Sequence, residues 1–422
     1  YEMAPIYEDA NIAADHQQLM MSTLQRVARR YGLLCLLHEK PFAGVNGSGK
    51  HLNWSCGTEG QNLLDPGDNP HDNMQFLFFC SAVLRAVYRH QDLLRASIAH
   101  AGNDHRLGAN EAPPSIISVF LGDQLTDVFE QIEHAGEALS SKDGGLLGLG
   151  VDALPNLPRH AGDRNRTSPF AFTGNKFEFR ALGSSQSVSF PATVLNTIVA
   201  EAIDEMVGEL ESRMSDGTDL GAALQGLLSD EAKGFKPIIF NGDGYSAEWV
   251  EEAERRGLLN LRSTMDALPS LVDSKNIELF EKYEVLSHRE LESRYEIKVE
   301  QYFMTINIEG ETAGDMARTM VLPAAVRYLS ELLQCADRAD EVGIKVKGIE
   351  TTAATVADAI NRLVEKLAVL DAQNAELGGE EVESKAEHMR ANIIPAMAEV
   401  REVVDELEDL VSDDLWPVPN YR

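Results

Sequence analysis

The sequence predicts an α+β protein, with a mixed first part over residues 1–190 and a mainly helical part over residues 191–422. Residues 52–55 and 176–180 alternate apolar and polar side chains, as a strand with one buried face does. After about residue 312, apolar side chains instead recur at helical spacing. The 422 residues are enough for two domains, and the change of pattern near residue 190 indicates their boundary.

The first part contains several predicted elements besides these strands. Residues 12–30 form a helix by pattern, with basic side chains in the last turn and a glycine after it. A second helix is predicted within residues 71–100. The continuous apolar run over residues 33–37 predicts a buried strand. Residues 103–114 and 141–168 are rich in Gly, Pro, Asp and Asn, and are therefore predicted to be loops.

The second part is predicted to be a scaffold and not a site of chemistry. Helices are expected over residues 191–214 and 245–257. A helical hairpin is expected from about residue 349 to 413, turning at Gly378–Gly379 and kinked at Pro395. The apolar stripes that would pack its two arms are Ile349, Val356, Ile360, Leu363, Leu367 and Leu370, and Val382, Met389, Ile393, Val400, Val403, Leu407 and Leu410.

Composition excludes several classes of partner. The formal net charge of −31 would repel nucleic acid and anionic membrane surfaces. No run of about 18 apolar residues is present, as a membrane-spanning helix would need. The four cysteines are widely spaced and form no Cys-x-x-Cys pair, which predicts reduced, buried thiols in an intracellular protein. The start on Tyr1 without an initiator Met suggests a piece of a longer chain.

The segment 38–55 is the most informative motif in the chain. Gly44, Gly49 and Lys50 match a phosphate-binding P-loop, but His51 stands where that motif needs Ser or Thr. A predicted strand, and not a helix, follows it. A glycine-rich turn that places a histidine on a strand suits metal coordination beside a phosphate. The simpler alternative is an ordinary glycine-rich hairpin with a hydrogen-bonded histidine.

Three further clusters combine charge with turn residues. Glu2, on a strand-like start, could hold a hard cation, although taken alone it is better explained as a surface residue. The loop 103–114 carries an Arg and a Glu and resembles a mobile lid. Residues 164–168 and 176–180 supply Arg and Lys for phosphates around Glu178, for which the alternative is a cross-strand salt-bridge ladder.

Taken in order, these motifs resemble glutamine synthetase, and in particular its long type III form. The most specific match is Lys40-Pro41-Phe42-Ala43-Gly44-Val45-Asn46-Gly47-Ser48-Gly49 through His51. Residues 106–113 resemble the flap loop of the family, Asn165-Arg166 its phosphate-contacting loop, and residues 178–180 its second metal and glutamate strand. The helical part resembles the type III extension. The resemblance implies a catalytic domain with a curved antiparallel sheet flanked by helices.

The resemblance also implies the reaction. ATP would phosphorylate the γ-carboxylate of L-glutamate, and ammonia would displace phosphate from γ-glutamyl phosphate to give glutamine, with two or more Mg²⁺ or Mn²⁺ ions per site. Glu2, His51 and Glu178 would be metal ligands, and Glu111, Arg166 and Arg106 catalytic residues. Glutamate would be bound by Asn46, Gly47, Arg106 and Arg180, and the nucleotide by Ser55, Asn53 and Lys176. Asn53 and Lys176 depart from the His and Arg of the bacterial type I pattern.

Assembly and location are likewise implied only by the resemblance. It implies a dodecamer of two hexameric rings in the cytoplasm, or in a plastid of a photosynthetic eukaryote. It also implies that further metal carboxylates and a β-grasp domain precede Tyr1. Two alternatives stay open from the residues alone. One is a non-catalytic scaffold or pseudoenzyme fragment of the same family, and the other is a P-loop NTPase that uses residues 44–50.

Overall fold

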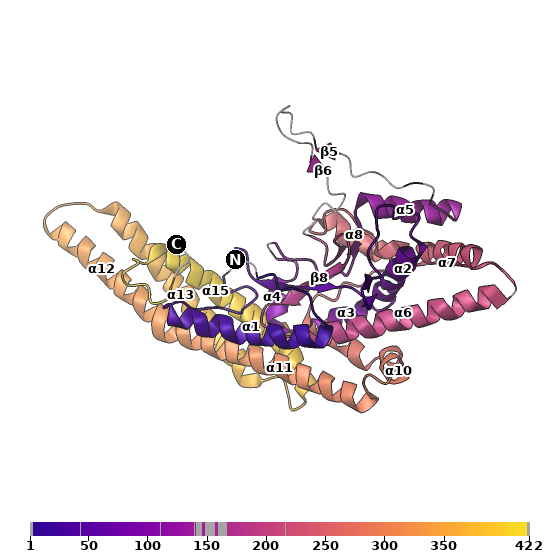
Figure 1. The fold of residues 1–422 in the computed structure, drawn as a ribbon. Helices are drawn as coiled ribbons and strands as arrows, with labels where there is room; N and C mark the ends of the chain where they lie inside the picture. The colour runs from indigo at the N-terminus through magenta and orange to yellow at the C-terminus, as the bar shows by residue number, and fades with distance from the viewer. Residues whose placement is uncertain are drawn as a thin grey trace. The chain divides into compact units, whose positions relative to one another are not determined.

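The chain forms two compact units, residues 1–292 and 293–422 (Figure 1). The computed structural model describes all residues except 1–2, 43, 110, 139, 141–145, 148–156, 159–166, 216 and 420–422. The α+β class predicted for the chain is confirmed, because a small sheet lies among helices in the first unit and helices dominate the second.

A four-stranded sheet forms the centre of the first unit. Its order is β1 (Gly49–Trp54), β8 (Phe177–Gly183), β7 (Phe170–Phe172) and β4 (Val119–Phe120). The first three strands are antiparallel neighbours, whereas β4 runs parallel to β7. Two further antiparallel pairs of two-residue strands lie among the described residues: β2 (Gly57–Thr58) with β3 (Gln61–Asn62), and β5 (Leu146–Leu147) with β6 (Leu157–Pro158).

Aromatic side chains fill the buried face of the sheet. Phe177 and Phe179 of β8 are fully buried because they point to the same side of the strand. The ring of Phe170 lies 5.3 Å from that of Phe177 and 5.8 Å from that of Phe179, measured between centroids. This packing leaves the alternate residues of β8, Glu178 and Arg180, on the other side of the strand.

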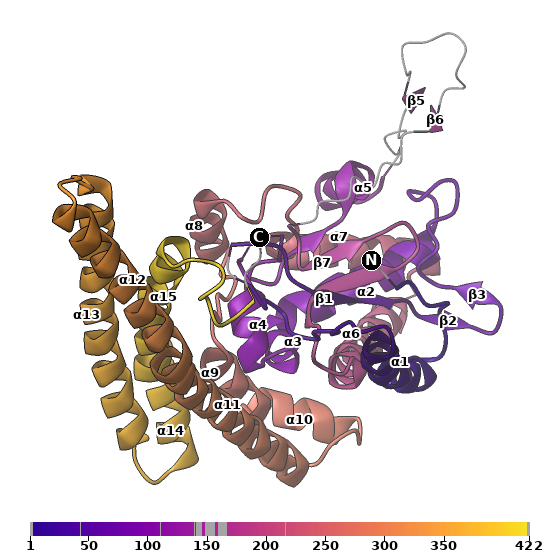
Figure 2. The ribbon, with the colours of Figure 1, turned by 90° about the vertical axis from the view of Figure 1, so that its left-hand side faces the viewer.

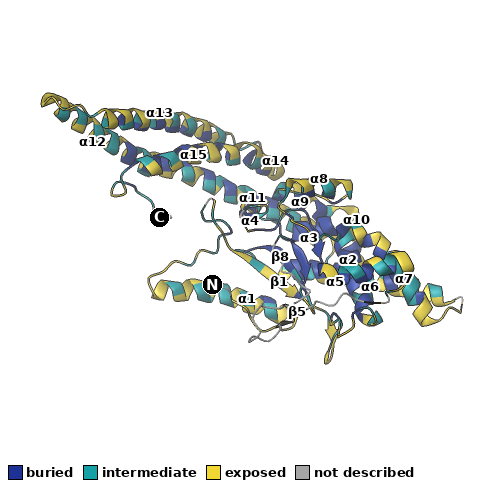
Figure 3. Cartoon of the chain, turned by 90° about the horizontal axis from the view of Figure 1, so that it is seen from above, coloured by how far each residue is buried: buried dark blue, intermediate teal, exposed yellow. Residues whose placement is uncertain are grey.

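Helices cover this sheet and extend the first unit. Figure 3 shows its buried residues gathered in β8, α2 and α3, whereas α1 is mostly exposed or half-buried. The helices are α1 (Ala10–Arg30), α2 (Met74–Arg89), α3 (Gln91–Ser97), α4 (Ala101–Arg106), α5 (Gly122–Ala135), α6 (Ser189–Ser215), α7 (Leu220–Phe235), α8 (Ala247–Arg255), α9 (Thr264–Ala267) and α10 (Ser274–Lys282). Two 3₁₀ turns, Lys236–Ile238 and Leu268–Val272, connect them.

A buried arginine joins α2 to two neighbouring helices. The Arg85 side chain is only 4% exposed, and its guanidinium contacts three carboxylates, those of Glu205 and Glu209 on α6 and of Glu231 on α7. A buried cation needs such partners because an isolated charge is costly to remove from water. The cluster therefore fixes α6 and α7 against α2.

The structure corrects three local predictions. The apolar run 33–37 is not a strand: Leu33, Leu34 and Leu36 are 65%, 82% and 53% exposed, and no described strand pairs with it. An apolar run becomes a buried strand only where a neighbouring edge supplies backbone partners and cover. The loop predicted from residue 103 is wrong for residues 103–106, which belong to α4. The helix expected within 71–100 is broken at His90 into α2 and α3.

The second unit is built from long helices. It contains most of α11 (His288–Met316), then α12 (Leu322–Glu341), α13 (Lys347–Glu376), α14 (Val382–His388) and α15 (Ile394–Leu410). Figure 2 shows α13 beside α15, and the two pack through their buried aliphatic side chains. π-Helical segments interrupt the helices at Ala317–Val321 and Met389–Ile393. The second lies directly before Pro395, where the sequence predicts a kink.

The four cysteines agree only in part with the prediction of reduced, buried thiols. All four cysteines are free, as predicted, but only Cys80 is buried, while Cys335 is exposed. Burial raises the pKa of the Cys56 thiol to about 11, so this half-buried group stays protonated.

Among the described helices, none combines the length and the apolar character that crossing a bilayer requires.

Candidate active site

The predicted metal ligands His51 and Glu178 meet across the β1–β8 pair. The register pairs Asn53 with Glu178 and shifts between Lys50 and Leu52, so His51 lies at a β-bulge. A bulge turns a side chain away from regular alternation. Here the Nδ1 atom of His51 lies 3.9 Å from Oε2 of Glu178, and both side chains reach solvent, at 45% and 20% exposure.

Arg180 is held next to this pair on β8. Its Nε donates a hydrogen bond of 2.9 Å to Oε2 of Glu178, although the two residues are only two positions apart. Arg180 itself is 5% exposed. Glu178 therefore contacts a cation on its own strand and a histidine on the next. The strand alternation that places Glu178 and Arg180 on one side of β8 produces this arrangement.

Arg106, at the end of α4, is the second buried arginine of the site. Its Nη2 donates to the backbone oxygen of Arg180 at 2.9 Å, and the residue is 5% exposed. Burial lowers the pKa of Arg106 to about 10, against the opposing charge of Glu39. No described residue accepts a hydrogen bond from its buried Nη1. A buried donor without a partner is costly, so this atom is suited to an anionic ligand.

Close contacts, one with backbone and one with the buried Arg106 side chain, explain two glycines of the 38–55 segment. A Cβ atom on Gly47 would lie 1.9 Å from the backbone oxygen of Glu39. A Cβ on Gly49 would lie 2.3 Å from Nη2 of Arg106. Both positions therefore require glycine for close approach. The strand β1 begins at Gly49, so the segment lacks the helix that a P-loop needs after its lysine.

A hydrogen bond joins this glycine-rich segment to the turn after α4. The Asn46 amide donates to Oε2 of Glu111 at 2.9 Å. Glu111 has a φ of +50°, in the left-handed region that a residue with a Cβ rarely adopts. Backbone strain of this kind is common at functional sites. The contact brings together two predicted site residues from turns about 65 positions apart.

The three predicted nucleotide-binding residues lie in β1 or directly beside the ends of β1 and β8. Asn53, opposite Glu178, and Ser55 are exposed, and Lys176 is half-buried directly before β8. The Asn53 amide reaches the backbone oxygen of His51 at 3.5 Å. These residues therefore lie on the His51 side of the strand pair, where they could contact a ligand that also contacts the histidine.

Two predicted site residues, Glu2 and Arg166, lie outside the described residues. Among the described residues, no group of three His, Cys, Asp or Glu side chains converges on one point. Two described side chains nevertheless suit a divalent cation, because the imidazole nitrogen of His51 and a carboxylate oxygen of Glu178 face each other across two strands. His51 and Glu178 could therefore supply two ligands of a metal site.

Three further residues of this region are not among the predicted ligase site residues. Glu39, 1% exposed, contacts the ends of both α4 and β8, and Lys50 donates to the backbone oxygen of Gln186 at 2.6 Å. The Tyr245 hydroxyl is near enough to Glu111 and Arg106 for their charges to affect its pKa, which burial raises. Glu39 and Lys50 lie within the motif and could have been found there. Tyr245 lies about 195 residues after Lys50 and gives no local signal.

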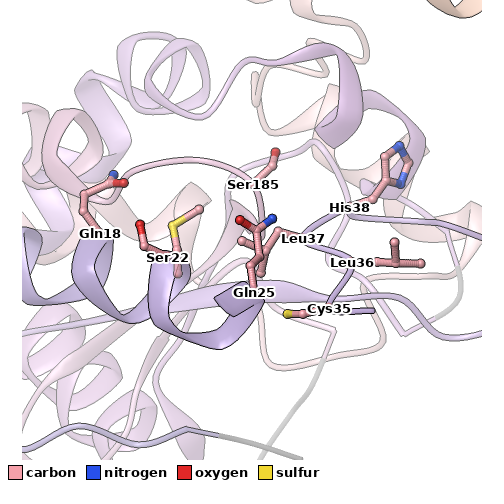
Figure 4. A pocket seen from close by; sticks show the side chains of 9 residues that line it. Gln18, Ser22, Gln25, Cys35, Leu36, Leu37, His38 and Ser185 are labelled. Atoms are coloured by element: carbon pink, nitrogen blue, oxygen red, sulfur yellow. The ribbon is translucent and has the colours of Figure 1, made fainter. Parts of the chain in front are cut away.

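A pocket lies beside α1, next to Ser185, which hydrogen-bonds Glu39. It is an open groove between α1 and the extended segment before the glycine-rich turn (Figure 4). None of the predicted site residues lines it. Its lining includes Gln18, Ser22, Gln25, Leu36, His38 and Ser185.

Comparison with known proteins agrees with the motif and with the helical second part. Residues 1–87 match the family model described as "Glutamine synthetase, catalytic domain", and residues 223–339 match "Glutamine synthetase C-terminal domain". Over its whole length the chain is 46% identical to "Type-3 glutamine synthetase" of Dictyostelium discoideum, covering 58% of that protein. It is 38% identical to "Glutamine synthetase" of Bacteroides fragilis (strain YCH46), covering 59% of it.

A third relative extends the comparison. The chain is 39% identical to "Glutamine synthetase" of Butyrivibrio fibrisolvens, again over its whole length, and covers 60% of that protein. It therefore spans about three-fifths of the length of these relatives. The descriptions of both family models and the names of all three relatives include glutamine synthetase. The chain belongs to the glutamine synthetase family.

Proposed function

We propose that this chain carries part of the active site of an ATP-dependent glutamate–ammonia ligase of the long, type III form. The enzyme would form γ-glutamyl phosphate from L-glutamate and ATP, and ammonia would then displace phosphate to give glutamine. The observation that carries the proposal is the meeting of His51 and Glu178 beside Arg180. Arg106 lies next to them, and its Nη1 donor has no acceptor among the described residues.

Arg106 and Arg180 are proposed to bind glutamate together with Asn46 and Gly47. The Nη1 atom of Arg106 offers a buried donor to a substrate carboxylate. Charge-assisted hydrogen bonds of this kind are strong and directional. Gly47 brings backbone close to the same region because it has no side chain. The glutamate would be oriented by groups whose own positions are fixed by packing.

His51 and Glu178 are proposed to hold Mg²⁺ or Mn²⁺, together with Glu2. When bound, such ions neutralise phosphate charge and polarise the phosphoryl group. The two described ligands lie on a rigid strand pair, which would fix the ATP phosphates relative to glutamate. Ser55, Asn53 and Lys176 would contact the nucleotide along the same strands.

Glu111 and Arg166 are proposed to act on the reacting groups. Arg166 would stabilise charge on the transferring phosphoryl group. Glu111 would close over γ-glutamyl phosphate, bind ammonium and accept its proton. The hydrogen bond between Asn46 and Glu111 supports this closure, because it links the turn to the loop proposed to bind glutamate. Closure also excludes water, which would otherwise hydrolyse a reactive acyl phosphate.

Domain division, assembly and location complete the proposal. Residues 1–190 would be the C-terminal part of the catalytic domain, and residues 191–422 the type III extension. The family suggests a dodecamer of two hexameric rings in the cytoplasm, or in a plastid. Neither family resemblance nor charge favours nucleic acid or a membrane as a partner.

Glutamine formation from glutamate, ammonium and Mg-ATP tests the proposal. It should be measured on this chain and on a protein extended by the additional sequence that its relatives carry. We expect activity in the extended protein, with phosphate release that needs both glutamate and ammonium. Assembly of the extended protein without any turnover would favour the alternative, a non-catalytic scaffold. ATP hydrolysis that ignores glutamate would favour a P-loop-type NTPase.

A further inference from the structure

A buried carboxylate outside the proposed ligand set lies at the centre of the site. Glu39 is 1% exposed, directly before the Lys40-Pro41 pair of the motif. Its Oε1 accepts hydrogen bonds from the backbone N of Ser185, at 3.0 Å, and from the Ser185 hydroxyl, at 2.5 Å. Buried carboxylates are rare and need partners, and this one is held by the segment that follows β8.

Two glycines, which have no side chain, leave space for the same carboxylate. A Cβ on Gly102, in the first turn of α4, would lie 2.4 Å from Oε2 of Glu39. A Cβ on Gly183, at the end of β8, would lie 2.4 Å from Oε1. The backbone oxygen of Glu39 meanwhile accepts from Ser48 in the glycine-rich turn, at 3.0 Å. Glu39 thus contacts all three segments that carry the proposed glutamate-binding residues.

The charge of Glu39 acts on two cations of the site. Burial lowers the pKa of Arg106 to about 10, and the negative charge of Glu39 opposes this shift and also favours the Lys50 ammonium. Both cations come close to the backbone around β8, Arg106 at Arg180 and Lys50 at Gln186. A buried cation keeps its charge and position only when an opposite charge compensates it.

The helix that carries Arg106 is otherwise fixed to β8 by hydrogen bonds. The Asn103 amide, fully buried, donates to the backbone oxygen of Ala181 at 2.9 Å. Arg106 donates to the next backbone oxygen, that of Arg180. These bonds fix the position of α4 along the strand, and the buried Glu39 carboxylate adds a negative charge that favours the guanidinium of Arg106.

We infer that Glu39 is a positioning residue for glutamate: it holds α4 against the end of β8 and compensates Arg106, so that the guanidinium faces the substrate carboxylate. This inference rests on the proposed ligase function. Because Glu39 contacts neither the metal-ligand pair nor the nucleotide-binding residues in the structure, its loss should weaken glutamate binding selectively. A merely structural carboxylate would instead affect both substrates and stability together.

The test compares wild-type protein with Glu39→Gln, both in the extended form. Titration calorimetry gives the dissociation constants for L-glutamate and for Mg-ATP, and thermal denaturation reports stability. We expect the glutamate constant to rise about tenfold or more. The Mg-ATP constant should change less than about twofold, and glutamate KM in glutamine formation should rise more than kcat falls.

A second variant and a control guard against simple misfolding. Gly102→Ala keeps the Glu39 charge but adds a Cβ against the carboxylate, so it should also weaken glutamate binding selectively. The control is Glu201→Gln on α6, a mostly buried carboxylate that contacts His90, 2.6 Å away. It should leave the glutamate constant unchanged, whatever it does to the melting temperature.

Two outcomes would overturn the role of Glu39. One is unchanged glutamate affinity in both Glu39→Gln and Gly102→Ala. The other is an equal loss of glutamate and Mg-ATP binding in both variants, with a matching loss of stability. A wild-type protein that binds Mg-ATP but no glutamate would instead overturn the proposed ligase function, and this role with it.

Discussion

The α4–β8 junction and the α13–α15 pair are both well packed, but they bury opposite kinds of side chain. At the junction, Asn103, Arg106 and Arg180 are 0%, 5% and 5% exposed. On α13 and α15 the buried side chains are aliphatic, such as Leu363 and Leu407, both at 0%. Ion pairs of the helix pair stay near solvent, as between Lys366 and Glu399.

We interpret the buried polar residues of the junction as serving substrate binding, and the buried aliphatic residues of the helix pair as stabilising the fold. Burying a polar group gives little net stability even when it is fully hydrogen-bonded. Aliphatic burial, by contrast, stabilises a fold directly. The junction therefore departs from local packing rules where the proposed substrate binds, and the helix pair follows them. Substitutions in the two regions should accordingly damage different properties.

The largest effect is expected at the junction itself. Arg106→Lys keeps a positive charge but removes the planar fork and the Nη1 donor. Losing the hydrogen bond from Nη1 to a charged carboxylate costs about 3 kcal/mol, so glutamate KM should rise about 100-fold. Steady-state kinetics of glutamine formation measures this. A glutamate KM that matches wild type would refute the proposed role of Arg106.

A loss of stability without loss of binding is expected in the helix pair. Leu363→Ala leaves a cavity in the α13 core and should lower the free energy of unfolding by about 3 kcal/mol. The neighbouring Val364, 49% exposed, is the matched control, and its change to Ala should alter stability by less than about 0.5 kcal/mol. Chemical denaturation with glutamate titration compares them. Weakened glutamate affinity in folded Leu363→Ala would break the separation between the regions.

A smaller, metal-specific effect is expected on β8. Glu178→Gln removes the carboxylate charge opposite His51 and should raise the Mg²⁺ concentration for half-maximal activity by at least about tenfold. Chelation should abolish turnover of the wild type, and added Mg²⁺ should restore it. Glu59→Gln, at an exposed turn between β2 and β3, is the control. An unchanged Mg²⁺ requirement in Glu178→Gln would argue against a metal at this pair.

The smallest effect is expected at the surface of the helix pair. Lys366 and Glu399 lie 3.0 Å apart, at 40% and 51% side-chain exposure. Such exposed ion pairs contribute little, so Lys366→Ala should change the free energy of unfolding by less than about 1 kcal/mol. Urea denaturation at low and high salt measures it. A larger loss would mean that charge, and not aliphatic packing, stabilises this region.

Periodicity predicted those elements whose structure depends on their own residues. The alternation over residues 176–180 indicated β8, and the stripe of Val356 and Leu363 indicated α13. The chance of a site near His51 and Glu178 could likewise be inferred from motif order. Their 3.9 Å contact could not, because it depends on the register of two strands about 130 residues apart and on the bulge at His51.

Tertiary contacts determine the secondary structure of the segments for which the sequence-based prediction was wrong. Residues 103–106 have loop-like composition, yet they are helical because Asn103 and Asp104 find buried partners in β8 and at Thr264. The run 33–37 has strand-like composition, yet it gains no described strand partner. Glu39 shows the same dependence: its importance lies in Gly102 and Gly183, which no local pattern connects to it.

The exposed leucines before the glycine-rich turn have a consequence for the behaviour of the chain in solution. Leu33, Leu34 and Leu36 form a short exposed apolar surface, which favours association between molecules. The net charge of −31 opposes that association by mutual repulsion. Added salt shortens the screening length from about 30 Å at 0.01 M to about 8 Å at 0.15 M. The colloidal stability of this chain should therefore fall as ionic strength rises, and light scattering would record the onset.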